Sequence, residues 1–134
     1  MLSLVKTAEE ISITEHHKRV RALRCVVSDD PSVQLHHCKG GSMVELLGAA
    51  GNPGVGKKVS DWLVIPLNWR YHTGDFGIDN GQGPYKDKAA WEAAFGTQVG
   101  HLVQVSLALG YDVFHRAGYP TIRMPHLQHL HGRD

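Results

Sequence analysis

Short stretches of apolar residues alternate with polar and glycine-rich stretches along this chain, and their pattern predicts mixed α and β structure. Residues 24–28 and 32–37 are rich in apolar and β-branched side chains, and the Asp-Asp-Pro sequence at 29–31 is typical of a turn. We therefore expect these two stretches to pair as a β-hairpin. A further brief extended segment is expected over 61–65.

Three helices are expected from capping residues and helical spacing. Thr14 is placed to cap a basic helix that runs to Leu23. Asp87 is placed to cap a helix through Phe95, and Thr97 is placed to cap a longer helix that a glycine closes. Apolar residues recur at helical spacing in the longer helix, so we assign them to the core.

Glycine is concentrated between residues 38 and 60, which predicts a long loop with one helical turn over 44–47. Pro66 suits the first turn of a short helix that runs through His72. Beyond these elements the end of the chain turns polar, and residues 120–134 are expected to form a flexible tail.

Together these elements predict an α+β fold, built as a small β-hairpin plus a helix with additional flanking helices. The chain has 134 residues, a length typical of a single domain. We expect one domain over residues 1–134, with a core that spans about 14–109. The formal net charge of +1 excludes a strongly basic DNA-coating protein, but it is compatible with a local basic face.

The expected compartment follows from the cysteines and from the hydropathy of the sequence. Cys25 and Cys38 are too few for a disulfide-rich secreted scaffold. The sequence shows no signal-peptide pattern and no apolar run of membrane-spanning length. We therefore expect a cytoplasmic protein with two free thiols and no membrane partner.

Histidines supply the candidate chemistry. His36 and His37 close the second expected strand, and His72 ends the expected short helix. Imidazole titrates near neutral pH and binds borderline metals, so one ring of such a group can hold a metal while its neighbour accepts a proton from water. The alternative is that a histidine pair at a strand end only faces solvent. His16 and His17 are expected to be surface or helix-face residues.

A series of short motifs follows in order between about residues 14 and 109. The motifs are Cys25-Val26-Val27-Ser28, Leu35-His36-His37, Gly40-Gly41, Lys58-Val59-Ser60-Asp61, Ile65-Pro66-Leu67, Tyr71-His72, Gly77-Ile78-Asp79 and the Trp-Glu-Ala-Ala-Phe-Gly-Thr-Gln sequence at 91–98. With this order and spacing the chain resembles the phage recombination-enhancement nucleases and related phage HNH nucleases. The resemblance implies a ββα-metal core and an origin in a phage or prophage, with the protein acting in the bacterial cytoplasm.

The resemblance also implies a role for each residue of the site. His37 takes the place of the general base, and His36 and His72 take the places of metal ligands. Asp61 falls where an acid or amide orients the base, which fixes the tautomer and plane of a catalytic ring. The alternative is that Asp61 only caps the turn that follows it. Asp79 is a candidate third ligand.

One departure from the family concerns a structural zinc. Relatives often hold this zinc with a Cys-x-x-Cys pair on the hairpin and a Cys-x-x-His pair that enters the helix. Here the corresponding positions are Cys25 and Ser28, then Asn68 and Tyr71. Because three of these side chains cannot replace thiolate or imidazole ligands, no structural zinc is expected.

The catalytic cofactor is expected to be one divalent metal ion. Two imidazoles suit zinc, nickel or another transition ion, and an added carboxylate shifts the preference toward magnesium or manganese. The expected partner is DNA, whose phosphates Lys39, Lys57, Lys58 and Arg70 are placed to neutralise.

These features lead to the hypothesis of a metal-dependent endonuclease or nickase that hydrolyses DNA phosphodiester bonds. One alternative is a non-catalytic nucleic-acid-binding module that retains the HNH shape. A second alternative is a small metallohydrolase with another substrate, although such an enzyme would need an enclosed apolar pocket and the glycine- and lysine-rich loop predicts an open, cationic site.

Overall fold

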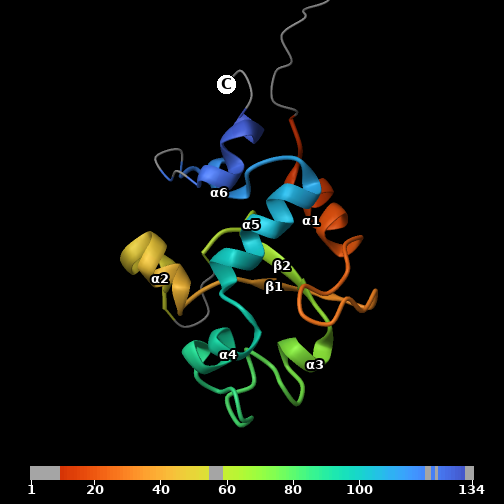
Figure 1. Ribbon diagram of the computed structural model, residues 1–134, viewed down its shortest axis with the longest axis vertical. Helices are drawn as coiled ribbons and strands as arrows, with labels where there is room; N and C mark the ends of the chain where they lie inside the picture. The colour runs from red at the N-terminus through yellow and green to blue at the C-terminus, as the bar shows by residue number, and fades with distance from the viewer. Residues whose placement is uncertain (1–9, 55–58, 120–121, 123, 132–134) are drawn as a thin grey trace, which may run out of the picture.

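Figure 1 shows the computed structural model of the chain. The structure describes residues 10–54, 59–119, 122 and 124–131, and within them the fold is α+β, with a two-stranded antiparallel sheet and helices around it. The elements in chain order are α1 (Ile13–Arg21), β1 (Gln34–His37), α2 (Ser42–Leu47), the 3-10 helix η1 (Gly48–Gly51), β2 (Val64–Leu67), α3 (Trp69–His72), α4 (Lys88–Phe95), α5 (Gln98–Leu109), α6 (Val113–Arg116) and the 3-10 helix η2 (Pro125–His131).

The strand pairing differs from the expected hairpin. Strand β1 pairs with β2, in antiparallel register that sets His36 opposite Ile65. Residues 24–28 form turns instead of a strand, because the Cys25 N–H bonds to the Asp30 carbonyl and the Asp29 N–H bonds back to the Cys25 carbonyl. These local bonds occupy groups that a ladder would need, so the apolar stretch makes one backbone bond to the sheet, from the Val26 N–H to the Pro66 carbonyl at 3.1 Å, but does not form a strand.

Pro66 lies inside β2 and not in the first turn of a helix, so that expectation was wrong. A proline removes one ladder donor, and an edge strand tolerates the loss. Both strands of a two-stranded sheet are edge strands. Helix α3 instead begins after Asn68, whose side-chain oxygen accepts a hydrogen bond from the Arg70 N–H at 3.1 Å.

Most of the helix caps agree with the sequence. Asp87 caps α4, Thr97 caps α5 and Gly110 closes α5 in a left-handed conformation, all as predicted. The first helix is the exception, because Ser12 and not Thr14 caps α1 by accepting from the Glu15 N–H at 3.0 Å.

Two segments contain more structure than expected. The long loop after β1 holds both α2 and η1, which extends the single helical turn that was predicted. The expected flexible tail includes η2, in which the Leu127 side chain is fully buried against the core. No helix in the described part of the chain is long and apolar enough to cross a membrane.

The core lies where α5 packs against β2. Leu63 and Ile65 from the β2 region, Leu102 from α5, Trp91 from α4 and Phe114 from α6 are all fully buried. Helix α5 also contacts α1, α2, α6 and η2, and it passes through the middle of the molecule in Figure 1. The first turn of α5 thereby comes to the end of β1, where the adjacent histidines lie.

Candidate metal centre

The strand and the short helix bring His36 and His72 together with Asp79. We call these three residues the inner group. The chain after α3 folds back on the helix, because the Asp79 N–H donates to the His72 carbonyl at 2.8 Å. Gly77 permits this return, since a side chain there would lie 2.6 Å from the His72 carbonyl oxygen. The Gly-Ile-Asp motif is thus the turn that places the Asp79 carboxylate beside the two rings.

Two imidazole nitrogens of the inner group approach the same carboxylate oxygen. His36 Nδ1 lies 3.1 Å from Asp79 Oδ2, and His72 Nε2 lies 3.0 Å from that oxygen. One possible ligand atom from each residue lies within 4.8 Å of those of the other two. Two imidazole nitrogens and a carboxylate oxygen form a donor set that fits a divalent zinc-like or manganese-like ion.

Asp79 carries the negative charge of this group. Burial by itself would raise the pKa of the Asp79 carboxyl, but hydrogen bonds from His36 and His72 and the charges of His36 and Lys88 outweigh burial and hold that pKa well below its usual range. Lys88 Nζ donates to Asp79 Oδ1 at 3.2 Å. The carboxylate is therefore ionised at neutral pH, with one oxygen facing the lysine and the other facing the rings.

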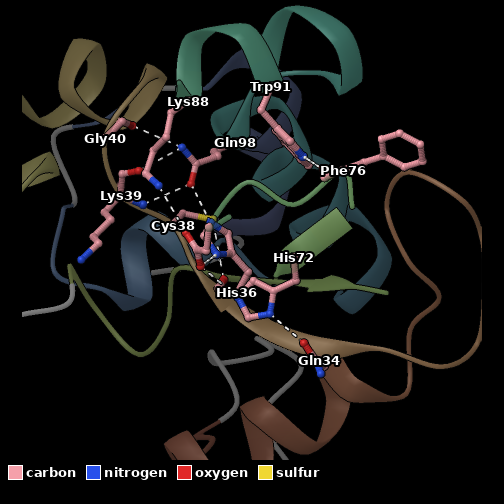
Figure 2. A network of polar contacts seen from close by, with 11 residues as sticks. Gln34, His36, Cys38, Lys39, Gly40, His72, Phe76, Lys88, Trp91 and Gln98 are labelled. Atoms are coloured by element: carbon pink, nitrogen blue, oxygen red, sulfur yellow. Dashed lines mark hydrogen bonds and ion pairs between the residues drawn. The ribbon is translucent and has the colours of Figure 1, made fainter. Parts of the chain in front are cut away.

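The other nitrogen of each ring contacts a glutamine. His36 Nε2 lies 2.9 Å from Gln98 Oε1, and His72 Nδ1 lies 2.9 Å from Gln34 Oε1. Figure 2 shows both contacts, with Gln98 reaching His36 from one side and Gln34 reaching His72 from the other. Each ring therefore has one nitrogen toward Asp79 and one toward an amide.

Cys38 lies beside His36 but does not belong to the donor set. Burial raises the pKa of the Cys38 thiol well above its usual value, and the negative charges of Asp79 and Glu92 raise it further. A metal-binding cysteine must be a thiolate. This fully buried thiol therefore stays protonated and acts as a small apolar residue of the core.

The adjacent glycines of the Gly-Gly motif allow α4 to pack closely beside the inner group. Gly40 and Gly41 have φ angles of +69° and +51°, which L side chains rarely adopt. A side chain at Gly40 would lie 2.8 Å from the Lys88 side chain, and one at Gly41 would strike the Glu92 carboxylate. The motif thus lets α4 approach the end of β1 and lets Lys88 reach Asp79.

His37 belongs to a second cluster, which we call the outer group, with His17 and Asp61. His37 Nε2 lies 3.0 Å from Asp61 Oδ1. His17 Nε2 lies 2.8 Å from the Asp61 backbone oxygen, and its ring meets the His37 ring edge-on at 5.9 Å. The side chains of His37 and Asp61 are 30% and 33% exposed, so this group is open to solvent.

His16 and His17 were both expected at the surface, and the structure corrects this for His16. Its side chain is fully buried, with Nδ1 2.6 Å from the Tyr111 hydroxyl and Nε2 3.0 Å from the Trp62 carbonyl oxygen. Burial and, to a smaller extent, the charges of His17, Arg116 and Arg19 outweigh the Trp62 hydrogen bond and lower the pKa of the His16 ring to about 4.

His17 and Gln98 are the site residues that the sequence did not reveal. His17 comes from α1 and Gln98 from α5, each far along the chain from the β1 residue that it contacts. The adjacent His-His sequence at 16–17 was a possible signal, but sequence alone does not tell which of the two neighbours turns toward β1. The glutamine of the 91–98 motif carried no chemical signal of its own.

The four expected DNA contacts are placed unevenly. Arg70 is exposed on α3, and Lys39 is half-buried at the end of β1, where its N–H donates to Gln98 Oε1. Lys57 and Lys58 lie outside the described residues. Arg70 and Lys39 therefore lie on, or just after, the two elements that carry His72 and His36.

The positions at which the resemblance would place ligands of a structural zinc have other contacts. The Ser28 N–H points to the buried Cys25 Sγ at 3.5 Å, and Asn68 caps α3 while donating from Nδ2 to the Ser32 carbonyl at 3.0 Å. Tyr71 packs edge-on against Phe95, with ring centroids 5.2 Å apart. The Asn68 bond thus joins the start of α3 to the segment before β1, and the Tyr71 contact joins α3 to α4.

No protein-family model matches the chain, and neither do any curated protein or solved structure. The inner and outer groups, with the surfaces around them, are therefore the basis for assigning a function. Their donor atoms, exposure and order along the chain each bear on that assignment.

Proposed function

We propose that this protein is a metal-dependent endonuclease or nickase that hydrolyses DNA phosphodiester bonds. The observation that carries the proposal is the approach of two imidazole nitrogens to one oxygen of Asp79. One of these nitrogens belongs to His36, the residue next to His37. The order β1, β2, α3, with adjacent histidines on the first strand and a third on the helix, supports a ββα-metal core. The strands of that core are β1 and β2, and not the hairpin expected from the sequence.

His37 is the proposed general base. An ionised carboxylate only accepts hydrogen bonds, so the Asp61 contact at 3.0 Å places the ring proton of neutral His37 on Nε2. Nδ1 is then the atom of this ring that can take a proton from water. Base catalysis by a positioned histidine contributes about a hundred- to ten-thousand-fold in rate.

The inner group is the proposed holder of one divalent ion. Such an ion, when bound, supplies positive charge that stabilises the charge developing on the phosphate as the bond is cut. His36, His72 and Asp79 offer two neutral nitrogens and one ionised oxygen for it. This mixed donor set accommodates magnesium, manganese, nickel or zinc.

DNA binding is the remaining part of the proposal. The formal charge of +1 means that affinity for phosphates must come from a local arrangement of cations. Arg70 is exposed on α3, the helix that also carries His72, and Lys39 follows the adjacent histidines on β1. These cations lie on, or just after, the elements that carry the proposed ligands and base, which favours a phosphodiester as the substrate.

The test is nicking of supercoiled plasmid with magnesium, manganese, nickel or zinc, using the parent chain, His37→Ala and His129→Ala. His129 is an exposed residue of η2 and controls for the loss of a histidine. We expect the parent and His129→Ala to convert plasmid to nicked or linear form and His37→Ala to leave it intact. Retention of DNA by the parent with no turnover in any metal would favour the non-catalytic binding module instead.

A further inference from the structure

Gln98 forms a set of hydrogen bonds that joins α5 to the end of β1. It is the first residue of α5, and its side chain is fully buried. Its Oε1 lies 2.9 Å from His36 Nε2 and accepts from the Lys39 N–H at 3.1 Å. Its Nε2 donates to the backbone oxygens of Lys39 at 3.1 Å and Gly40 at 3.3 Å. Figure 2 shows the amide of Gln98 with its contacts to His36, Lys39 and Gly40.

The partners on the backbone leave one orientation for this amide. A backbone N–H only donates and a backbone carbonyl only accepts. The atom that meets the Lys39 N–H must therefore be the amide oxygen, and the atom that meets the Lys39 and Gly40 carbonyls must be the amide nitrogen. The oxygen and the nitrogen of the amide are thus assigned independently, and the two assignments agree. The amide oxygen faces His36, so Nε2 of the His36 ring must carry a proton.

The backbone of Gln98 is held as firmly as its side chain. Its N–H donates to Glu92 Oε2 at 2.7 Å, and the same carboxylate oxygen accepts from the Ser42 hydroxyl at 2.5 Å. The Ser42 hydroxyl in turn accepts from the Val99 N–H at 3.2 Å. These buried bonds connect α2, α4 and α5, so Gln98 cannot turn away from His36 without breaking several of them.

We infer that Gln98 is a positioning residue that fixes His36 as its Nε2–H tautomer and thereby commits Nδ1 of this ring to the metal. Nδ1 is then the nitrogen that faces Asp79 Oδ2 at 3.1 Å. Two electron-rich atoms cannot face each other at this distance, so either a proton on Nδ1 that donates to the carboxylate or a metal ion in place of that proton occupies the contact. The buried amide therefore keeps the inner group ready for an ion, with no change of tautomer on binding.

Contacts of Gln34 and Lys88 indicate the other two ligand atoms. Gln34 Oε1 lies 2.9 Å from His72 Nδ1, which leaves Nε2 of that ring facing Asp79. Lys88 occupies Asp79 Oδ1, so Oδ2 is the oxygen available to an ion. The expected ligand atoms are thus Nδ1 of His36, Nε2 of His72 and a single oxygen of Asp79. Gln34 is exposed whereas Gln98 is buried, so we assign the stronger effect to Gln98.

This inference rests on the metal centre of the proposed function but not on DNA cleavage, and nuclear magnetic resonance of the parent chain tests it directly. With isotope-labelled histidine and no metal, at a pH where the ring is neutral, we expect the His36 proton on Nε2. With NMR-active cadmium, we expect a one-bond cadmium–nitrogen coupling to His36 Nδ1 and to His72 Nε2. A coupling to His36 Nε2, or a metal-free ring that is protonated on Nδ1, would overturn the inference.

The two proposals fail in different ways. Cadmium bound through the stated atoms by a chain that never cuts DNA in any metal would support the ligand assignment and overturn the nuclease. No cadmium binding at all would overturn both the metal centre and the ligand assignment. Cadmium bound through other atoms by a chain that cuts DNA would overturn only the role of Gln98.

A matched pair of variants measures the size of the effect. Gln98→Met keeps the length of the side chain but removes both ends of the amide, and Gln104→Met makes the same change at an exposed position of α5. We expect metal affinity about 10- to 100-fold weaker in Gln98→Met, since loss of an outer partner of a ligand typically costs this much. The His36 ring should also show some Nδ1–H tautomer in this variant. Equal affinity and an unchanged tautomer in a folded Gln98→Met chain would contradict the assignment, and the parent-chain spectra decide the matter if this variant does not fold.

Discussion

The inner and outer groups are built from two histidines that are neighbours on β1. Successive side chains of a strand point to opposite faces, so His36 and His37 enter different surroundings. His36 is 1% exposed and faces Asp79 and the first turn of α5, whereas His37 is 30% exposed and faces Asp61 and α1. One residue of offset along the chain therefore separates a buried ring from a solvent-accessible one.

The contacts of the two groups differ in kind as well as in burial. In the inner group the buried glutamine accepts from Nε2 of His36, so the nitrogen facing the Asp79 carboxylate is the one that can exchange its proton for a metal ion. In the outer group, His17 and His37 each point Nε2 at an oxygen of Asp61, and an N–H donor explains each contact by itself. The inner group is thus suited to hold an ion, and the outer group is suited to accept a proton.

The largest effect that would test this division is the loss of the proposed base. His37→Ala should lower the rate of DNA cleavage by about a hundred- to ten-thousand-fold while leaving metal affinity unchanged. Single-turnover cleavage and calorimetric metal titration of the same preparation give both quantities, and His129→Ala is the control for each. A loss of metal affinity equal to that of a ligand variant would place His37 on the ion and end the comparison.

The reciprocal change is His36→Ala. We expect metal affinity to fall by more than about 100-fold, because removal of an outer partner alone costs about 10- to 100-fold. Cleavage should fall with it, whereas DNA retention at low salt should persist through the cations of the surface. The measurement is zinc or manganese titration with the thermal midpoint recorded in parallel. If His36→Ala binds metal as tightly as the parent chain, the inner group is not the metal centre.

A smaller effect is expected at Asp61, and it tests whether the outer group can itself hold an ion. Asp61→Asn keeps an oxygen that can accept from His37 but removes the charge. We expect cleavage about 10- to 100-fold slower at unchanged metal affinity. Asp75→Asn, an exposed acid in the loop after α3, is the matched control. Metal stoichiometry falling from two ions to one in Asp61→Asn would show that the outer group is a second metal site.

Features with a local signal were predicted well from the sequence. Asp87 and Thr97 were recognised as caps because a cap needs only a short polar side chain and a few following residues. The Gly-Ile-Asp turn is also local, since its return onto α3 spans only a few residues. His72 and Asp79 therefore end up adjacent through contacts that lie within one short stretch of chain.

Pairing between distant segments was the part that sequence patterns did not predict. The 24–28 stretch has the composition of a strand, but internal turn bonds compete for its backbone, and β2 takes its place beside β1. The contact between Gln98 and His36 depends on how α5 crosses the sheet. Burial of His16 likewise depends on which face of α1 packs inward. Tertiary packing decides all three, and no short motif encodes it.

The last comparison concerns His16, a buried ring next to the outer group. Its Nε2 faces a carbonyl oxygen that only accepts, so Nε2 carries the proton and Nδ1 accepts from the Tyr111 hydroxyl. Both nitrogens are used by the neutral ring. Through Trp62, whose carbonyl it meets, His16 supports the residue next to Asp61.

We expect the stability of the chain to fall in mild acid because of this ring. The folded pKa of His16 is lowered to about 4, whereas the ring in the unfolded chain titrates near 6.5. Between these values the unfolded state binds more protons, so the stabilisation is complete above pH 6.5 and is lost as the pH falls toward 4. From pH 7.5 to pH 5 the loss should be about 2 kcal/mol.

Urea unfolding of the parent chain and of His16→Gln at pH 7.5 and pH 5 measures this loss of stability, and His129→Gln is the control. The His16→Gln chain should be less stable at pH 7.5 but should lose about 2 kcal/mol less than the parent on acidification. Equal losses in the two chains would show that the buried ring does not govern the acid response.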